Sequence, residues 1–176
     1  MTRIAALLRG VNVGGNKKIA MADFRTVLSD LGYDDVRTLL QSGNAVFSAK
    51  GNAAKPAAVE KRIEKALADL GLTTRCLART ADELQAVIDG HPLVDLADNG
   101  SRMLAVFLSE DLDPALADEV VALAPDHIRI GSRVVYQWCP DGILQAPELV
   151  PLVAKRTKIA ATARNWNTVV KIGAAL

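Results

Sequence analysis

Residues 5–18 read AALLRGVNVGGNKK, and this stretch decides the fold of the chain. Its apolar beginning is too short for a helix, so it predicts a buried strand over Arg3 to Arg9. Three glycines among arginine, asparagine and lysine residues then predict a loop. A helix is predicted over residues 21–31, where Gly32 ends it. The loop between this strand and this helix is the candidate functional site.

The segments that follow complete a strand, helix, strand, strand, helix, strand order. Strands are predicted at residues 35–40, 45–49 and 73–79, and an amphipathic helix from Pro56 to Leu70 stands before the last of them. This order is the ferredoxin-like pattern. We therefore predict an α+β protein whose residues 1–80 form a ferredoxin-like βαββαβ half.

The ferredoxin-like order also makes a geometric prediction about Gln41-Ser42-Gly43-Asn44, the predicted turn between the second and third strands. The crossover from the first strand to the second is right-handed, and the third strand returns between them. The loop at residues 9–18 and the turn at residues 41–44 should therefore be neighbours at one edge of the sheet.

The second half of the chain repeats the opening pattern in weaker form. A helix and connector are predicted over residues 81–101, with Thr80 and Glu83 as a capping box. A second, related βαββ-plus-helices half is predicted over residues 102–176. No closing strand is evident in it, and Thr162 is the predicted cap of the last helix.

The predicted last helix carries polar groups beyond what packing requires. Arg164 falls at its start, where the helix dipole favours anions, so a carboxylate or a bound anion is the expected partner of the guanidinium. Trp166 has two open interpretations, a packing anchor or a platform on which a base stacks.

Charge is distributed unevenly although the net charge is only +1. Residues 1–22 hold four bases and no acid, and residues 149–176 hold five bases and no acid. All 20 acids share residues 23–148 with the other 12 bases. If the fold brings the two ends together, an anion-attracting face results; otherwise these are solvated charges on different faces.

Several classes of function are disfavoured. No apolar run approaches the length of a membrane span, so we expect a cytoplasmic protein with no membrane partner. Cys76 and Cys139 lack metal-ligand spacing and are expected to be buried reduced thiols, and no metal site is expected. The glycines match neither a dinucleotide fingerprint nor a P-loop, and His91 and His127 form no recognisable catalytic arrangement.

Three motifs together resemble the bacterial family known as domain of unknown function 1697. They are Leu7-Leu8-Arg9-Gly10-Val11-Asn12-Val13-Gly14-Gly15, Gln41-Ser42-Gly43-Asn44 and Thr162-Ala163-Arg164-Asn165-Trp166-Asn167-Thr168. The resemblance covers essentially the whole chain. It implies a compact α+β protein built on ferredoxin-like halves, and no particular activity. Ala146 and Pro147 depart from the family, which commonly has Ser-Lys there.

These observations support one main hypothesis and two alternatives. The main one is a binding module for an anionic ligand, a nucleotide or single-stranded nucleic acid, in a cleft formed by the loop, the turn and the last helix. The alternatives are an enzyme acting on a small phosphorylated or carboxylated substrate, and motif residues that are purely structural. The sequence identifies no cofactor and no oligomeric state. The predicted ligand-binding residues are Arg9, Gly10, Asn12, Gly14, Gly15, Gln41, Ser42, Asn44, Arg164, Asn165 and Asn167.

Overall fold

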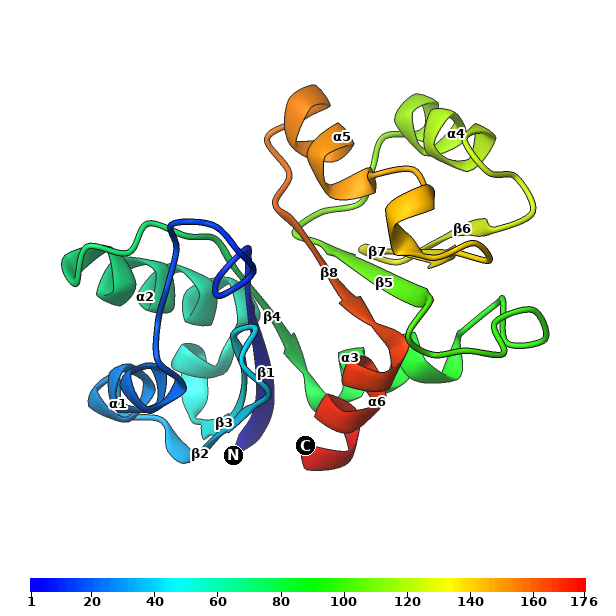
Figure 1. Ribbon diagram of the computed structural model, residues 1–176. Helices are drawn as coiled ribbons and strands as arrows, with labels where there is room; N and C mark the ends of the chain where they lie inside the picture. Colours follow the sequence, from blue (N-terminus) through cyan, green and yellow to red (C-terminus); the bar gives the residue numbers. More distant parts are fainter. The chain divides into compact units, whose positions relative to one another are not determined.

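A computed structural model describes residues 1–176 (Figure 1). The chain divides into two compact units, residues 1–85 with 171–176, and residues 86–170. Each unit contains one four-stranded antiparallel sheet. None of the helices combines the length and the apolar character that a membrane span requires.

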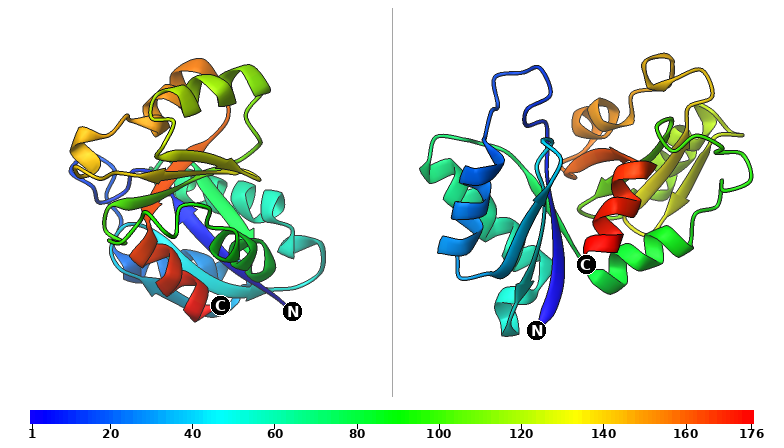
Figure 2. Two further views of the ribbon diagram at one scale, coloured as in Figure 1. Left: turned by 90° about the vertical axis from the view of Figure 1, so that its right-hand side faces the viewer. Right: turned by 60° about the horizontal axis from the view of Figure 1, so that its bottom comes forward.

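The first half follows the predicted ferredoxin-like order. Its elements are β1 (Thr2–Leu8), α1 (Met21–Asp30), β2 (Asp34–Leu39), β3 (Asn44–Ala49), the 3-10 turn η1 (Gly51–Ala54), α2 (Pro56–Asp69), β4 (Cys76–Thr80) and α3 (Ala81–Asp89). The strand order is β2-β3-β1-β4, so β3 lies between β1 and β2 as predicted. α1 and α2 lie on one face of this sheet (Figure 2).

The core of the first unit accounts for every second residue of the apolar run in β1. Ile4, Ala6 and Leu8 point into the core beneath α1 and α2. The helices contribute their own stripes, with Phe24 from α1 and Ile63 from α2 both fully buried. Alternation along the strand and helical spacing along α1 and α2 place these side chains in one layer.

Glutamate side chains bind the backbone N–H groups along the outer edge of β4. β4 pairs only with β1, so the N–H groups of Cys76, Ala78 and Thr80 point away from the sheet. Cys76 N donates to Glu64 Oε1 at 2.8 Å and Ala78 N donates to Glu60 Oε1 at 2.9 Å. Thr80 N donates to an oxygen of Glu83 at 2.9 Å. Each outward donor of this edge strand is therefore satisfied within the chain.

The second half contains a closing strand that the sequence did not reveal. Its elements are β5 (Met103–Leu108), α4 (Pro114–Ala122), β6 (Ile128–Gly131), β7 (Val134–Trp138), the 3-10 turn η2 (Ile143–Gln145), α5 (Leu149–Arg156), β8 (Ala161–Asn165) and α6 (Trp166–Ala175). The strand order is β6-β7-β5-β8. This order matches that of the first sheet strand for strand, so the two halves share one pattern. α4 and α5 lie on one face of the second sheet (Figure 1).

The predicted start of the last helix was wrong. Thr162 and Arg164 belong to β8, where they pair with Phe107 and Ala105, and the helix begins two residues later at Trp166. The actual cap is Asn165, whose Oδ1 accepts from Thr168 N at 2.9 Å. β8 was missed because its apolar positions hold only alanine, which has a weak strand preference, and its strand conformation comes from pairing with β5.

Candidate functional site

The loop between β1 and α1 is a tight structure that depends on left-handed backbone. Gly10 and Gly14 have φ of 65° and 86°, and Asn12 has φ of 57°. Glycine adopts such angles without steric cost, and asparagine tolerates them better than most residues. Asn12 N donates to Lys17 O at 2.9 Å and closes the loop upon itself.

Asn12 holds this loop to the β2–β3 turn. Its Nδ2 donates to Ile19 O and to Gln41 O, both at 2.7 Å. Its Oδ1 accepts from Ile19 N at 3.0 Å. Both amide hydrogens of Asn12 are therefore committed within the chain, and its side chain determines the shape of the loop.

The predicted meeting of loop and turn is confirmed. Leu8 N donates to Gly43 O at 2.8 Å, in addition to the bond between Asn12 and Gln41. A Cβ at Gly43 would lie 2.7 Å from Leu8 Cβ and 2.7 Å from Val11 Cγ2, so the approach of the two segments leaves room only for glycine. Topology alone brings together segments about thirty residues apart, as the connection rules predict.

Asn44 lies in β3 and not in the turn, which corrects the predicted boundary. Its side chain is fully buried, and its Nδ2 donates to Leu39 O at 3.1 Å and to Ser42 Oγ at 3.0 Å. The Asn44 side chain thus joins the end of β2 to the turn by hydrogen bonds. Gln41 is exposed at the surface. Ser42 is partly buried.

A basic hollow of about 480 Å³ lies on one side of the loop. It is lined by Arg9, Gly10, Gly15, Asn16, Lys17 and Arg75. Every titratable group in this lining is a base. The Arg9 guanidinium and the Lys17 ammonium form no ion pair or hydrogen bond within the chain.

Arg75 was missed by sequence reasoning. It reaches the hollow because β4 pairs with β1, which places the residue before β4 opposite the residue after β1. Arg9 N donates to Arg75 O at 3.0 Å, and the Thr74 hydroxyl donates to Arg9 O at 2.7 Å. The Arg75 side chain, which is half exposed, is oriented by Glu64 through a 3.1 Å contact between Nε and Oε1.

The other predicted site residues, Arg164, Asn165 and Asn167, lie in the second unit and have local roles there. Arg164 is 8% exposed, and its Nη1 donates to Thr162 Oγ1 and to Ala163 O, both at 2.9 Å. Asn165 is the cap of α6, and the amide of Asn167 fills the space beside Gly100. A cleft that combines these residues with the loop at residues 9–18 stays a prediction.

Trp166 packs within an aromatic cluster of the second unit. Its ring centroid lies 4.3 Å from that of His91 and 6.3 Å from that of Tyr136. The Tyr136 hydroxyl donates to Val87 O at 2.7 Å, and His91 Nδ1 accepts from Leu93 N at 3.2 Å. Burial lowers the pKa of His91 and raises the pKa of Tyr136. These contacts give Trp166 the role of a packing anchor in this unit.

The two cysteines are free buried thiols, as predicted. Cys76 lies in β4, and Cys139 follows β7. Burial raises the pKa of Cys139 to about 11. Its thiol is therefore protonated and poorly nucleophilic at neutral pH.

Fold and site together define an α+β protein of two related ferredoxin-like halves, with a glycine-rich basic loop after the first strand. The chain belongs to the family described as protein of unknown function (DUF1697), whose model matches residues 1–136. It is also similar in structure to the conserved bacterial protein SP0830 from Streptococcus pneumoniae, with a TM-score of 0.71 and 25% identity over 100% of this chain and 98% of that one. No curated protein matches the chain in sequence. The family resemblance inferred from the motifs is thereby confirmed; the first two motifs lie within the matched residues, and the third, at residues 162–168, lies outside them.

Proposed function

We propose that the chain is a binding module for an anionic, phosphate-bearing ligand, either a nucleotide or single-stranded nucleic acid, held in the basic hollow beside the first loop. The observation that carries the proposal is the lining of that hollow. Arg9, Lys17 and Arg75 line it together with no carboxylate in the lining; Glu64, outside the lining, pairs with Arg75, while Arg9 and Lys17 are unpaired. Like charges gathered in one place repel, and a bound anion offsets that cost.

The loop suits a phosphate group in shape as well as in charge. Gly10 and Gly15 present no side chain to the hollow, and a Cβ at either position would meet no other atom. Their open backbone lets an anion approach closely. Arg9 supplies a planar guanidinium that matches two phosphate oxygens, whereas Lys17 supplies a point charge.

Absence of an acid or an imidazole in the lining favours binding over catalysis. A general base must lie within hydrogen-bonding reach of the proton it removes. The titratable side chains of the lining are two arginines and one lysine. Its chemistry is therefore electrostatic recognition.

The test is a titration of the full chain with ATP, ADP and fluorescein-labelled oligo-uridylate at low and moderate salt. Three phosphate contacts predict that oligonucleotide affinity falls roughly twentyfold between about 50 and 200 mM salt. Arg9→Gln and Lys17→Gln should each weaken binding about tenfold. Lys61→Gln, which removes an exposed unpaired lysine from α2, is the control for net charge and should leave affinity within about twofold.

Two outcomes would refute the proposal. One is the absence of salt-dependent binding to any of the three probes. The other is an equal loss of affinity in the Lys17→Gln and Lys61→Gln variants, because binding would then depend on overall charge and not on the hollow. Affinity that grows with oligonucleotide length would identify nucleic acid, and affinity that is greatest for ATP would identify a nucleotide.

A further inference from the structure

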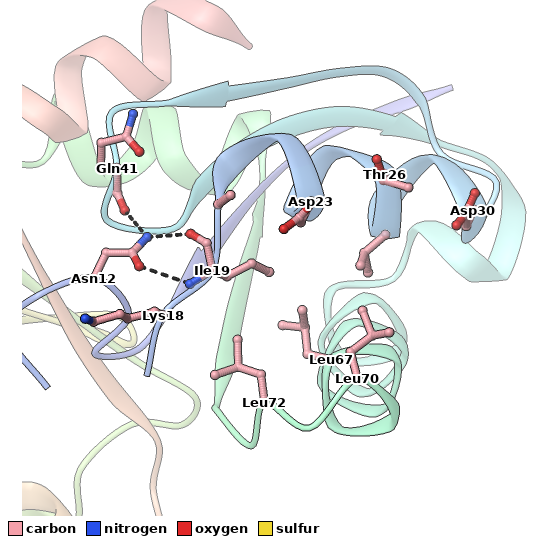
Figure 3. A pocket seen from close by; sticks show the side chains of 12 residues that line it. Asn12, Lys18, Ile19, Asp23, Thr26, Asp30, Gln41, Leu67, Leu70 and Leu72 are labelled. Carbon is pink, nitrogen blue, oxygen red and sulfur yellow. Dashed lines mark hydrogen bonds between the residues drawn. The ribbon is translucent and has the colours of Figure 1, made fainter. Parts of the chain in front are cut away.

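A second hollow, a groove of about 770 Å³, lies between α1 and the C-terminal end of α2 (Figure 3). Its two walls differ in chemistry. α1 lines one wall with Asp23, Thr26 and Asp30, while Leu67, Leu70 and Leu72 line the opposite wall. The groove is therefore acidic along α1 and apolar along the opposite wall, and Lys18 is the one base in its lining, beside Asn12 (Figure 3).

The two carboxylates form one stripe of α1. Asp23 and Asp30 are seven residues apart, which places them on the same face and about 10 Å apart along the helix axis. Both side chains are exposed, and neither forms an ion pair. They are therefore available to an external cation at both ends of the wall.

Asp30 has no explanation in the stability of α1 itself. It is the last residue of the helix, where the dipole disfavours a carboxylate, and the last turn contains no basic residue. Asp23 stands in the first turn, where the dipole alone accounts for an acid. The carboxylate of Asp30 therefore lowers the stability of α1 in the free chain, and a bound cation would offset this loss.

The leucine wall has a second feature that is unfavourable in the free chain, an apolar side chain exposed to water. Leu70 is 69% exposed, although Leu67 beside it is fully buried and Leu72 is packed against the core. Removing the Leu70 side chain from water is favourable, and an apolar surface laid in the groove would do so. Both walls are thus complementary to one kind of partner.

We infer that this groove binds a cationic amphipathic helix of a partner protein. Apolar side chains of that helix cover Leu70 and Leu72, and two basic side chains seven residues apart face Asp23 and Asp30. A helix fits because its i and i+7 residues have the same spacing as the two aspartates of α1. This site is separate in its residues from the basic hollow, so neither proposal depends on the other.

The test uses fluorescence anisotropy with the full chain and two synthetic helical peptides. Both peptides carry leucines along one stripe; the first has two lysines seven positions apart beside that stripe, and the second has glutamates there. The lysine peptide should bind at least tenfold more tightly. Asp23→Asn with Asp30→Asn should weaken it at least tenfold, as should Leu70→Gln. Asp82→Asn, at an exposed acid of α3 outside the groove, should change affinity less than twofold.

Each contrary result would overturn the inference. Equal affinity for the lysine and glutamate peptides would show that the acidic wall does not select a cation. Equal weakening by Asp82→Asn would show attraction to net charge only. No binding at about 1 mM peptide would show that the groove is not a helix site. Sedimentation that finds a dimer lost on Leu70→Gln substitution would assign the leucine wall to a second copy of the chain.

Discussion

The Nδ2 atom of Asn12 lies 2.7 Å from the main-chain oxygen of Gln41, and this bond ties the first loop to the β2–β3 turn across 29 residues. The same amide group bonds twice to Ile19, so one side chain joins three segments. The loop that lines the basic hollow on one side and the acidic groove on the other is shaped by this residue.

Asn12→Ala should therefore destabilise the chain strongly. It removes three hydrogen bonds and places alanine at a φ of 57°, for a combined loss of about 3 kcal/mol in the free energy of unfolding. Urea denaturation of both proteins measures the difference. Asn16→Ala, in the same loop but exposed and without a hydrogen bond, should cost less than about 0.5 kcal/mol. Equal losses in the two variants would contradict the role assigned to Asn12.

Gly43→Ala is expected to be among the most damaging single-methyl changes in the chain. Its φ is 83°, and the added Cβ would lie 2.7 Å from side-chain atoms of Leu8 and Val11. Gly51→Ala is the matched comparison, since φ is 57° there and nothing lies within 4 Å. We expect a loss of about 1 kcal/mol at Gly51 and at least about 3 kcal/mol at Gly43, measured by thermal or urea unfolding.

Stability should fall as pH drops toward 6, in part because of His91. Burial lowers the pKa of this imidazole below its ordinary value of 6.5, so the unfolded chain takes up the proton at a higher pH. The stability contributed by neutral His91 is complete above the ordinary pKa and is lost as pH falls through it toward the folded value. Protonation of His91 also breaks the hydrogen bond that Leu93 N donates to Nδ1. Melting temperatures should fall more steeply with pH for wild type than for His91→Gln; parallel curves would refute this.

Neither cysteine should react with a thiol reagent while the chain is folded. A pKa of about 11 leaves roughly one Cys139 in a thousand as thiolate at pH 8, and burial blocks access to both thiols. Ellman's reagent should detect no thiol in the native protein and two after denaturation. Rapid reaction of one thiol under native conditions would mean that the region around Cys139 or Cys76 opens readily.

Asp30→Asn should raise stability slightly. The substitution removes a negative charge from the C-terminal end of α1, where it opposes the helix dipole, and the expected gain is about 0.5 kcal/mol. Asp23→Asn should have the opposite sign, because that carboxylate stands in the first turn. Chemical denaturation at low salt resolves both changes. A loss of stability at Asp30 would reveal an internal role for its carboxylate.

Most of the first half could be predicted because its signals are local. β1 is an apolar run, and α2 carries a clean stripe that ends at Gly71. The capping box of Thr80 and Glu83 is present, with Glu83 N donating to Thr80 Oγ1 at 3.2 Å. Even the meeting of loop and turn could be predicted, since connection rules convert an order of elements into positions.

What the sequence did not reveal depends on pairing between distant strands. β8 has no apolar residue larger than alanine and becomes a strand because it pairs with β5. Arg75 enters the basic hollow because β4 pairs with β1, and no local pattern marks it. The acidic groove was missed for the same reason, because the aspartates of α1 and the leucines of α2 meet only after both helices pack on one face of the sheet.

The glutamates along β4 have a consequence for how these chains behave in a crowded solution. A sheet edge with unpaired backbone groups can pair with another polypeptide as an additional strand, and repeated additions of this kind form aggregates. Here Glu60, Glu64 and Glu83 already occupy the outward donors of that border. The first sheet is thereby protected on this side against polymerisation, by side chains of the same helices that flank it.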